Sequence, residues 1–227
     1  LWKILDVEPE ETGPVSLLLI LSFLMGLFLA TVAVASQTLF LTSFDEKSDL
    51  PVAIAVSGLI GMAVTMLYNF LQGRIPFSAL AILSLLLVTT LTGFLEFGDS
   101  FINNKDDLYF FGFTLILPFT FLIQLVFWGS FNRMFNVRVA KRLVGSVDVG
   151  TDIAAILSFF SIPILLGFGV DLISLYTIGL VSIAAFVILF SLMANRYLIK
   201  SRATVKSESD IKKLLIGEFI GNNYIIM

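Results

Sequence analysis

The sequence predicts an all-α integral membrane protein with six transmembrane helices. Its mean hydropathy is +0.99, and 58% of its 227 residues are hydrophobic. Only 14% of the residues are charged, whereas soluble domains carry about 25%. Six apolar runs are each long enough to cross a bilayer, which takes about 20 mainly apolar residues. The surplus of apolar surface is therefore expected to face lipid.

The six runs follow one another with short connections, at residues 14–44, 51–71, 76–97, 108–135, 144–168 and 172–198. Pro14, Pro51 and Pro76 stand at the starts of the first three runs, where a missing N–H costs a helix nothing. Pro118 and Pro163 fall inside runs four and five, and such prolines predict local kinks.

The basic residues predict how the chain is oriented. If the six runs cross the membrane in turn, both termini lie on the same side as the connections after runs two and four. That side carries 12 of the 14 Lys and Arg residues, and only Lys47 and Lys105 fall on the other side. A Lys/Arg excess marks cytoplasmic loops. We therefore expect a cytoplasmic N-terminal segment at 1–13, a six-helix half-bundle at 14–198 and a cytoplasmic linker at 199–227, in a bacterial inner membrane.

The last segment turns apolar again at Tyr224. It is either an interfacial amphipathic helix or a linker leading into a seventh spanning helix. We favour the second interpretation, in which the sequence is a fragment of a longer protein.

Composition and motifs exclude several kinds of chemistry. The chain has no Cys and no His, which removes zinc, disulfide, thiolate and imidazole sites. It also has no phosphate-binding loop, nucleophile elbow or metalloprotease motif. The basic residues lie at the ends of apolar runs instead of forming a soluble basic face. We therefore expect no enzyme activity, no cofactor, no metal and no nucleic-acid partner.

Polar residues at membrane depth are costly, so each is a candidate functional residue. Gln37 lies in run one and Gln124 in run four, while Asp148 and Asp152 stand four residues apart on one face of run five. We take these four as substrate or coupling candidates. The alternative for the two aspartates is a structural ion pair with the neighbouring basic stretch.

That basic stretch separates runs four and five. Asn132, Arg138, Lys141 and Arg142 are candidates for a cytoplasmic gate or an anion site, and Arg142 and Asp148 could form a gate pair. The alternative is that the basic residues serve orientation alone.

Small residues recur at intervals of four in two runs. The first series is Ala53, Ser57 and Gly61, and the second is Gly150, Ala154 and Ser158. Small residues at this spacing let helix backbones approach closely. They predict tight packing inside the bundle or, alternatively, a self-association face.

One segment resembles a known family. Residues 127–152 read FWGSFNRMFNVRVAKRLVGSVDVGTD, and residues 38–59 contain LFLTSF followed by LPVAIAVSGL. Both are similar to the ATP/ADP translocases of plastids and obligate intracellular bacteria. The residues that carry the resemblance are Phe127, Trp128, Gly129, Asn132, Ala140, Lys141, Arg142 and Gly150.

The resemblance implies one half of a major-facilitator-type bundle, whose substrate path lies between two six-helix halves. It also implies secondary transport of an anionic or nucleotide-like solute by alternating access. The expected partners are the lipid bilayer, a small-molecule substrate, and the C-terminal half of the same chain or a partner subunit.

The sequence departs from the family at two places. The family has a basic residue in helix one, where residues 33–37 read AVASQ, and an acidic residue early in helix four, near Ile116. These departures motivate an alternative function, a transport-inactive membrane anchor, scaffold or sensor subunit.

Overall fold

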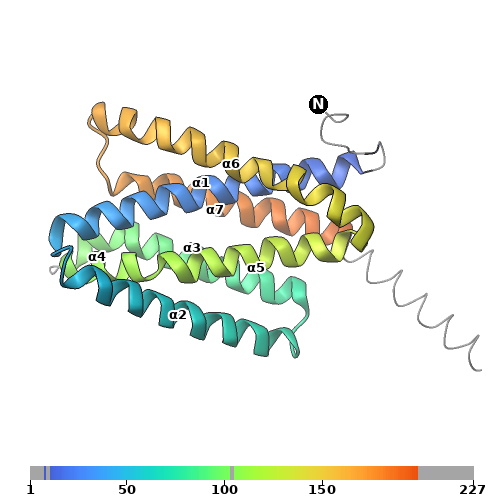
Figure 1. Ribbon diagram of the computed structural model, residues 1–227, viewed down its shortest axis with the longest axis horizontal. Coiled ribbons are helices and arrows are strands. Elements are labelled where there is room, and N and C mark those ends of the chain that lie inside the picture. Colours follow the sequence, from blue (N-terminus) through green and yellow to red (C-terminus); the bar gives the residue numbers. More distant parts are fainter. Residues whose placement is uncertain (1–7, 9–10, 103–104, 199–227) are drawn as a thin grey trace, which may run out of the picture.

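The computed structural model describes residue 8, residues 11–102 and residues 105–198. Over these residues the chain is helical, without strands (Figure 1). The helices are α1 (Thr12–Ser43), α2 (Asp49–Gln72), α3 (Phe77–Phe101), α4 (Lys105–Thr114), α5 (Ile116–Met134), α6 (Val137–Gly167), α7 (Ser174–Met193) and the short π-helical turn η1 (Ala194–Leu198).

Six of the described segments are long and apolar enough to cross a membrane, as the sequence predicts. Helices α4 and α5 together form one of them, Lys105–Met134. The chain is therefore an all-α integral membrane protein. The predicted linker at 199–227 and its seventh helix lie outside the described residues.

The two internal prolines lie at different positions in their spans. The fourth span is interrupted at Leu115, between α4 and α5, where Pro118 cannot donate to the carbonyl of Thr114 four residues earlier. The predicted local distortion is thus present there. Pro163 lies inside α6, which continues to Gly167.

The predicted start of run five, at residue 144, is too late, because α6 begins at Val137. Only Phe135 and Asn136 separate α5 from α6. The Asn136 side chain caps α6 by accepting a hydrogen bond of 3.0 Å from the Val139 N–H, which satisfies an otherwise unpaired donor of the first turn. Arg138 and Lys141 therefore lie on the opening turns of α6.

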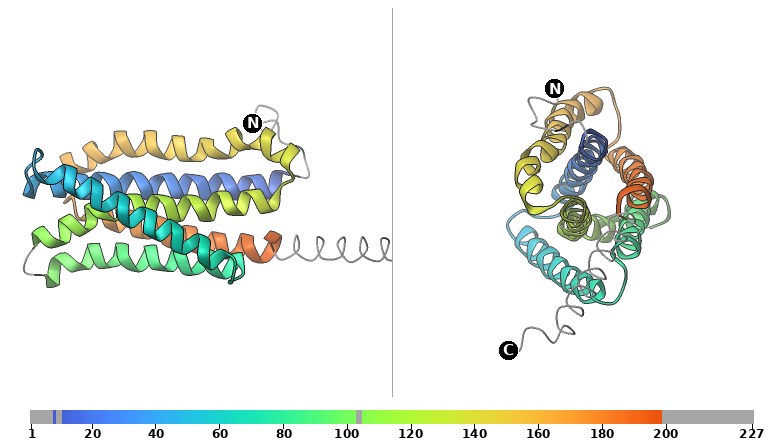
Figure 2. Two further views of the ribbon diagram at one scale, coloured as in Figure 1. Left: turned by 60° about the horizontal axis from the view of Figure 1, so that its bottom comes forward. Right: turned by 90° about the vertical axis from the view of Figure 1, so that its right-hand side faces the viewer.

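Helix α1 is central in the bundle and packs against α6 on one side and α7 on the other (Figure 2). Helix α3 packs mainly on α7, and α2 packs mainly on α5. The large buried side chains of this core are mostly Leu and Phe, such as Leu18, Phe28, Phe119 and Phe186.

Small residues allow the closest of these helix contacts. A Cβ added at Gly150 of α6 would lie 2.5 Å from the Leu19 carbonyl oxygen of α1, and Ala154 and Ser158 are also buried. On α2, a Cβ at Gly61 would lie 2.9 Å from the Phe121 ring of α5. Both series of small residues thus pack inside the bundle, as predicted by the first of the two interpretations.

The two ends of the bundle carry different connections between helices (Figure 1), and their charges differ. We call one the basic end; it carries the α2–α3 and α5–α6 connections and η1, with Arg74, Arg133, Arg138, Lys141, Arg142 and Arg196. The acidic end carries the other three connections, with Asp45, Glu46, Asp49, Asp106, Asp107 and Asp171 beside Lys47 and Lys105.

Candidate functional site

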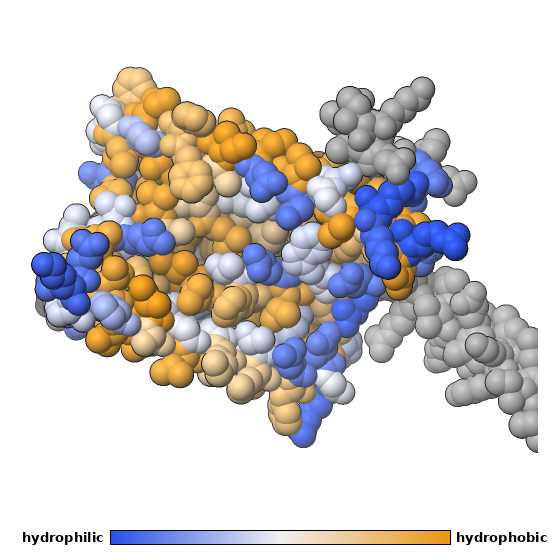
Figure 3. Space-filling view, viewed as in Figure 1, coloured by the Kyte–Doolittle hydropathy of each residue, from blue (hydrophilic) through white to orange (hydrophobic). Residues whose placement is uncertain are grey.

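The polar residues predicted to lie at membrane depth are at the surface of the helical bundle. Gln37, Gln124 and Asp152 are exposed and Asp148 is half-buried. Asp152 stands at the midpoint of α6, fifteen residues from Val137 and fifteen from Gly167. Hydrophilic residues interrupt the otherwise hydrophobic surface over α6, α5 and α2 (Figure 3). We call this surface the polar face.

Helices α3 and α7 present a different surface. Their large exposed side chains are apolar, among them Leu86 and Phe97 of α3 and Val181 and Ile188 of α7. The exposed hydroxyl of Thr90 on α3 donates to the Leu86 carbonyl of its own helix. This surface suits lipid, whereas a carboxylate at the midpoint of α6 does not.

A groove lies between α2 and α5 on the polar face, with a cavity volume of about 870 Å³. Ligand pockets in proteins occupy roughly 300–1,000 Å³. The two helices are in contact where Phe121 covers Gly61 and diverge toward the basic end (Figures 1 and 2). The residues that line the groove are Gly58, Met62, Thr65, Met66, Tyr68, Gln72, Phe121, Gln124, Leu125, Trp128, Gly129, Asn132 and Arg133.

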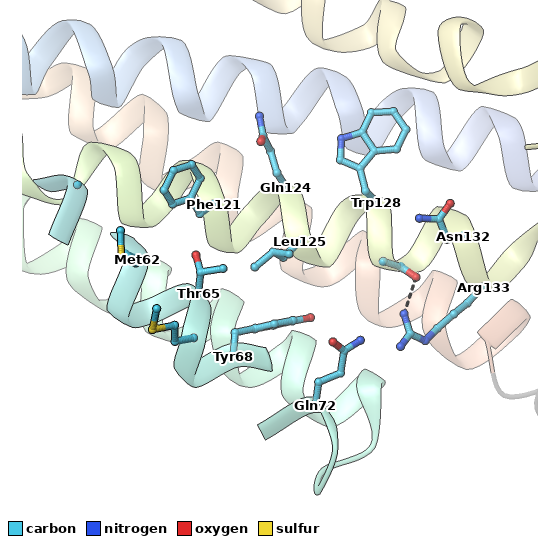
Figure 4. A pocket seen from close by; sticks show the side chains of 13 residues that line it. Met62, Thr65, Tyr68, Gln72, Phe121, Gln124, Leu125, Trp128, Asn132 and Arg133 are labelled. Atoms are coloured by element: carbon cyan, nitrogen blue, oxygen red, sulfur yellow. Dashed lines mark hydrogen bonds between the residues drawn. The ribbon is translucent and has the colours of Figure 1, made fainter. Parts of the chain in front are cut away.

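A row of side chains from α5 lines the groove. Gln124, Trp128 and Asn132 are spaced by four residues and point to the same side in Figure 4. The four-residue spacing places them on one face of the helix. Two of the predicted site residues, Gln124 and Asn132, are thus brought together in one groove.

Three polar groups converge where the groove meets the basic end. The Tyr68 hydroxyl, the Gln72 amide and the Arg133 guanidinium point toward one another (Figure 4). Tyr68 is only 3% exposed, and its buried hydroxyl has no hydrogen-bond partner among the described residues. A buried polar group without a partner costs about 1–3 kcal/mol, so this hydroxyl is a place where a ligand atom would be stabilised.

Arg133 is held in position by its surroundings. Its Nη1 donates to the Gly129 carbonyl at 2.9 Å, and its guanidinium lies 3.8 Å from the centre of the Phe77 ring. A guanidinium stacked on an aromatic ring and bonded to the backbone loses part of its rotamer freedom. The cation is therefore preorganised at the mouth of the groove.

The other predicted residues lie outside this groove. Gln37 lines a separate cavity of about 380 Å³ with Leu50, Ser57 and Phe113. Lys141 lines a third cavity, of about 440 Å³, which Asn132 also borders. Arg138 is exposed on the first turn of α6.

The predicted pair of Arg142 and Asp148 is not formed. Arg142 instead donates to Glu8 at 2.8 Å and to Glu11 at 2.6 Å, which ties α6 to the segment that begins α1. Asp148 and Asp152 form no ion pair with any described residue. The structural ion pair considered for the aspartates is therefore absent from the described part of the chain.

The three polar residues that converge in the groove, Tyr68, Gln72 and Arg133, were not among the predicted site residues. Tyr68 is one polar atom in an apolar run, and Gln72 and Arg133 lie at helix ends, where polar residues are ordinary. Only the four-residue interval between Tyr68 and Gln72 on α2 indicated a shared face.

Glu96 lies inside α3, near the acidic end, where it accepts a hydrogen bond from the Thr177 hydroxyl of α7. Among the described residues, no group of three or more His, Cys, Asp or Glu side chains could hold a metal ion.

Comparison with known protein families, with curated proteins and with solved structures finds no match to this chain. The relationship to the ATP/ADP translocases stays a prediction that rests on the quoted motif.

Proposed function

We propose that this bundle is one half of a secondary transporter, and that a solute moves along its polar face. The observation that carries the proposal is the exposure of Asp152 and Gln124 at membrane depth, beside a groove large enough for a small molecule. An exposed carboxylate at mid-membrane is stable only against protein or water. The opposite surface, over α3 and α7, has the apolar character that lipid requires.

A second bundle completes the path in this proposal. It would be the C-terminal half of the same chain or a partner subunit, as in major-facilitator proteins. Binding sites in such transporters lie near the midplane, between two repeats that rock against each other. The basic end would face the cytoplasm, because Lys and Arg accumulate on that side.

Cysteine accessibility tests the proposal directly, because the chain contains no Cys. Gln124→Cys and Asp152→Cys place a thiol on the polar face, and Leu86→Cys and Val181→Cys are matched controls on the apolar face. In sealed vesicles, a charged, membrane-impermeant thiosulfonate is applied from one side and then from the other. Thiols react as thiolates, which form only where water reaches them.

If the polar face lines an alternating path, the first two variants are labelled from both sides and the two controls from neither. Equal labelling of all four variants would contradict the proposal. Complete protection of Gln124→Cys and Asp152→Cys would show a face sealed by protein, as in a transport-inactive anchor or scaffold.

A further inference from the structure

We propose that the solute of the α2–α5 groove is a single-chain amphiphile with one anionic group and an apolar body. This inference rests on the proposed function in taking the groove as the solute site. The anionic group would lie against Tyr68, Gln72 and Arg133, and the apolar body would extend along the groove toward the membrane interior.

The three converging groups select an acceptor. Arg133 can only donate hydrogen bonds, the Gln72 amide nitrogen donates two, and the Tyr68 hydroxyl donates one. The buried Tyr68 hydroxyl has no partner among the described residues. A ligand oxygen placed between these donors would satisfy it, and hydrogen bonds to an ionised acceptor are about twice as strong as neutral ones.

The charge of the groove limits the charge of the ligand. Among the described residues that line it, Arg133 is the single charged side chain, and none is acidic. One guanidinium balances one negative charge. A polyphosphate would bring several negative charges to this one guanidinium, and the excess charges would have no cationic partner among the described residues that line the groove.

The remainder of the groove is elongated and mainly apolar. Met62, Met66, Phe121 and Leu125 line it, beside the polar side chains of Thr65, Gln124 and Asn132. The lined part of α2 runs from Gly58 to Gln72, about 20 Å at the rise of an α-helix. Methionine side chains adapt to varied apolar shapes, so the groove suits a flexible chain better than a rigid ring.

Trp128 lines the groove and supplies a reporter. The only other tryptophan is Trp2, so a Trp2→Phe background isolates its fluorescence. The protein is placed in phosphatidylcholine nanodiscs and titrated with ω-bromoundecanoate, whose bromine quenches a nearby indole. The uncharged alcohol ω-bromoundecanol is the matched ligand control.

We expect saturable quenching by the carboxylate and at least about 10-fold weaker binding of the alcohol, because a charge-assisted hydrogen bond contributes about 1.5–3 kcal/mol. Arg133→Gln should weaken carboxylate binding about 10-fold, and Tyr68→Phe several-fold. Arg74→Gln is the protein control. Arg74 lies at the same end, 4.3 Å from the Phe70 ring, but does not line the groove.

Equal binding of acid and alcohol would overturn the inference, as would equal effects of Arg133→Gln and Arg74→Gln in variants that keep their thermal unfolding transitions. Displacement of the probe by ATP would indicate a nucleotide instead. Loss of quenching in phosphatidylglycerol nanodiscs would assign the groove to a membrane lipid and also contradict the inference.

The two proposals fail separately. If Gln124→Cys is labelled from both sides but the protein does not bind the carboxylate, only the amphiphile inference is contradicted. If the protein binds the carboxylate but Gln124→Cys and Asp152→Cys are not labelled, the transport proposal is contradicted and the groove is a static anion site.

Discussion

Replacing Gly150 by alanine would test the contact between α1 and α6, on which the polar face depends. The added Cβ would lie 2.0 Å from the Ser22 Oγ, 2.5 Å from the Leu19 carbonyl oxygen and 2.9 Å from the Phe23 nitrogen. The serine hydroxyl can rotate away. The two backbone atoms cannot, so α1 must move.

The size of the effect follows from these distances. Non-bonded heavy atoms rest about 3.5–4.0 Å apart, so α1 would retreat by about 1 Å from α6. A gap of that size forfeits a quarter to a half of the dispersion energy of the atoms involved. Rotation of Ser22 also breaks its 2.9 Å hydrogen bond to the Leu19 carbonyl, worth about 1 kcal/mol. With about 1–3 kcal/mol for overpacking, Gly150→Ala should lower the free energy of unfolding by about 2–4 kcal/mol.

The assay is equilibrium unfolding in mixed micelles, followed by circular dichroism. Gly145→Ala is the matched control, because it lies on the same helix and a Cβ there meets nothing within 4 Å. That variant should be unchanged or more stable by up to about 1 kcal/mol, since alanine is the better helix former. Equal unfolding free energies for the two variants would refute the close α1–α6 packing.

Three further predictions use the same unfolding assay. Arg142→Gln should lower the free energy of unfolding by about 1 kcal/mol at low salt and by less at high salt, because it removes a partly buried ion pair with Glu11. Arg138 is exposed, so Arg138→Gln should leave that free energy unchanged; equal losses in the two variants would contradict the ion pair. Ser158→Ala should be neutral or stabilising by up to about 1 kcal/mol, because its buried Oγ has no hydrogen-bond partner among the described residues. Ser130→Ala removes a 2.7 Å hydrogen bond to the Val126 carbonyl and should be the less stable variant; the reverse order of stability would contradict this explanation. Asp152→Asn should change stability by less than about 0.5 kcal/mol and reduce uptake of radiolabelled undecanoate into proteoliposomes; unchanged uptake would remove Asp152 from the mechanism.

Much of the fold was predictable because a bilayer constrains a sequence strongly. Backbone polar groups in lipid must be satisfied within each helix, so six apolar runs predict six spanning helices. The predicted start of α6 is wrong because the sequence places Arg138 and Lys141 before the helix, whereas α6 begins at Val137. Charged side chains lie equally well on the opening turns of a helix that emerges from the membrane.

The candidate site was predictable only in part. Polarity at membrane depth identified Gln124 and the aspartates. It could not identify Arg133, because an arginine at a helix end is expected wherever a helix leaves the bilayer. Nor could it predict that Arg142 pairs with Glu8 and Glu11, since each glutamate lies more than 130 positions from Arg142 in the sequence.

The sequence by itself determined that the described part of this chain has six segments able to cross a membrane, with one basic and one acidic end. Hydropathy and charge are local properties, and the bilayer constrains both directly. Tertiary structure alone decided which helices touch, that α2 and α5 diverge to form a groove, and that Tyr68, Gln72 and Arg133 meet within it. Those contacts depend on how helix surfaces fit together, with Gly26 and Gly150 setting one approach and Gly61 another. Fit of that kind is a property of pairs of helices, which the pattern of a single helix does not contain.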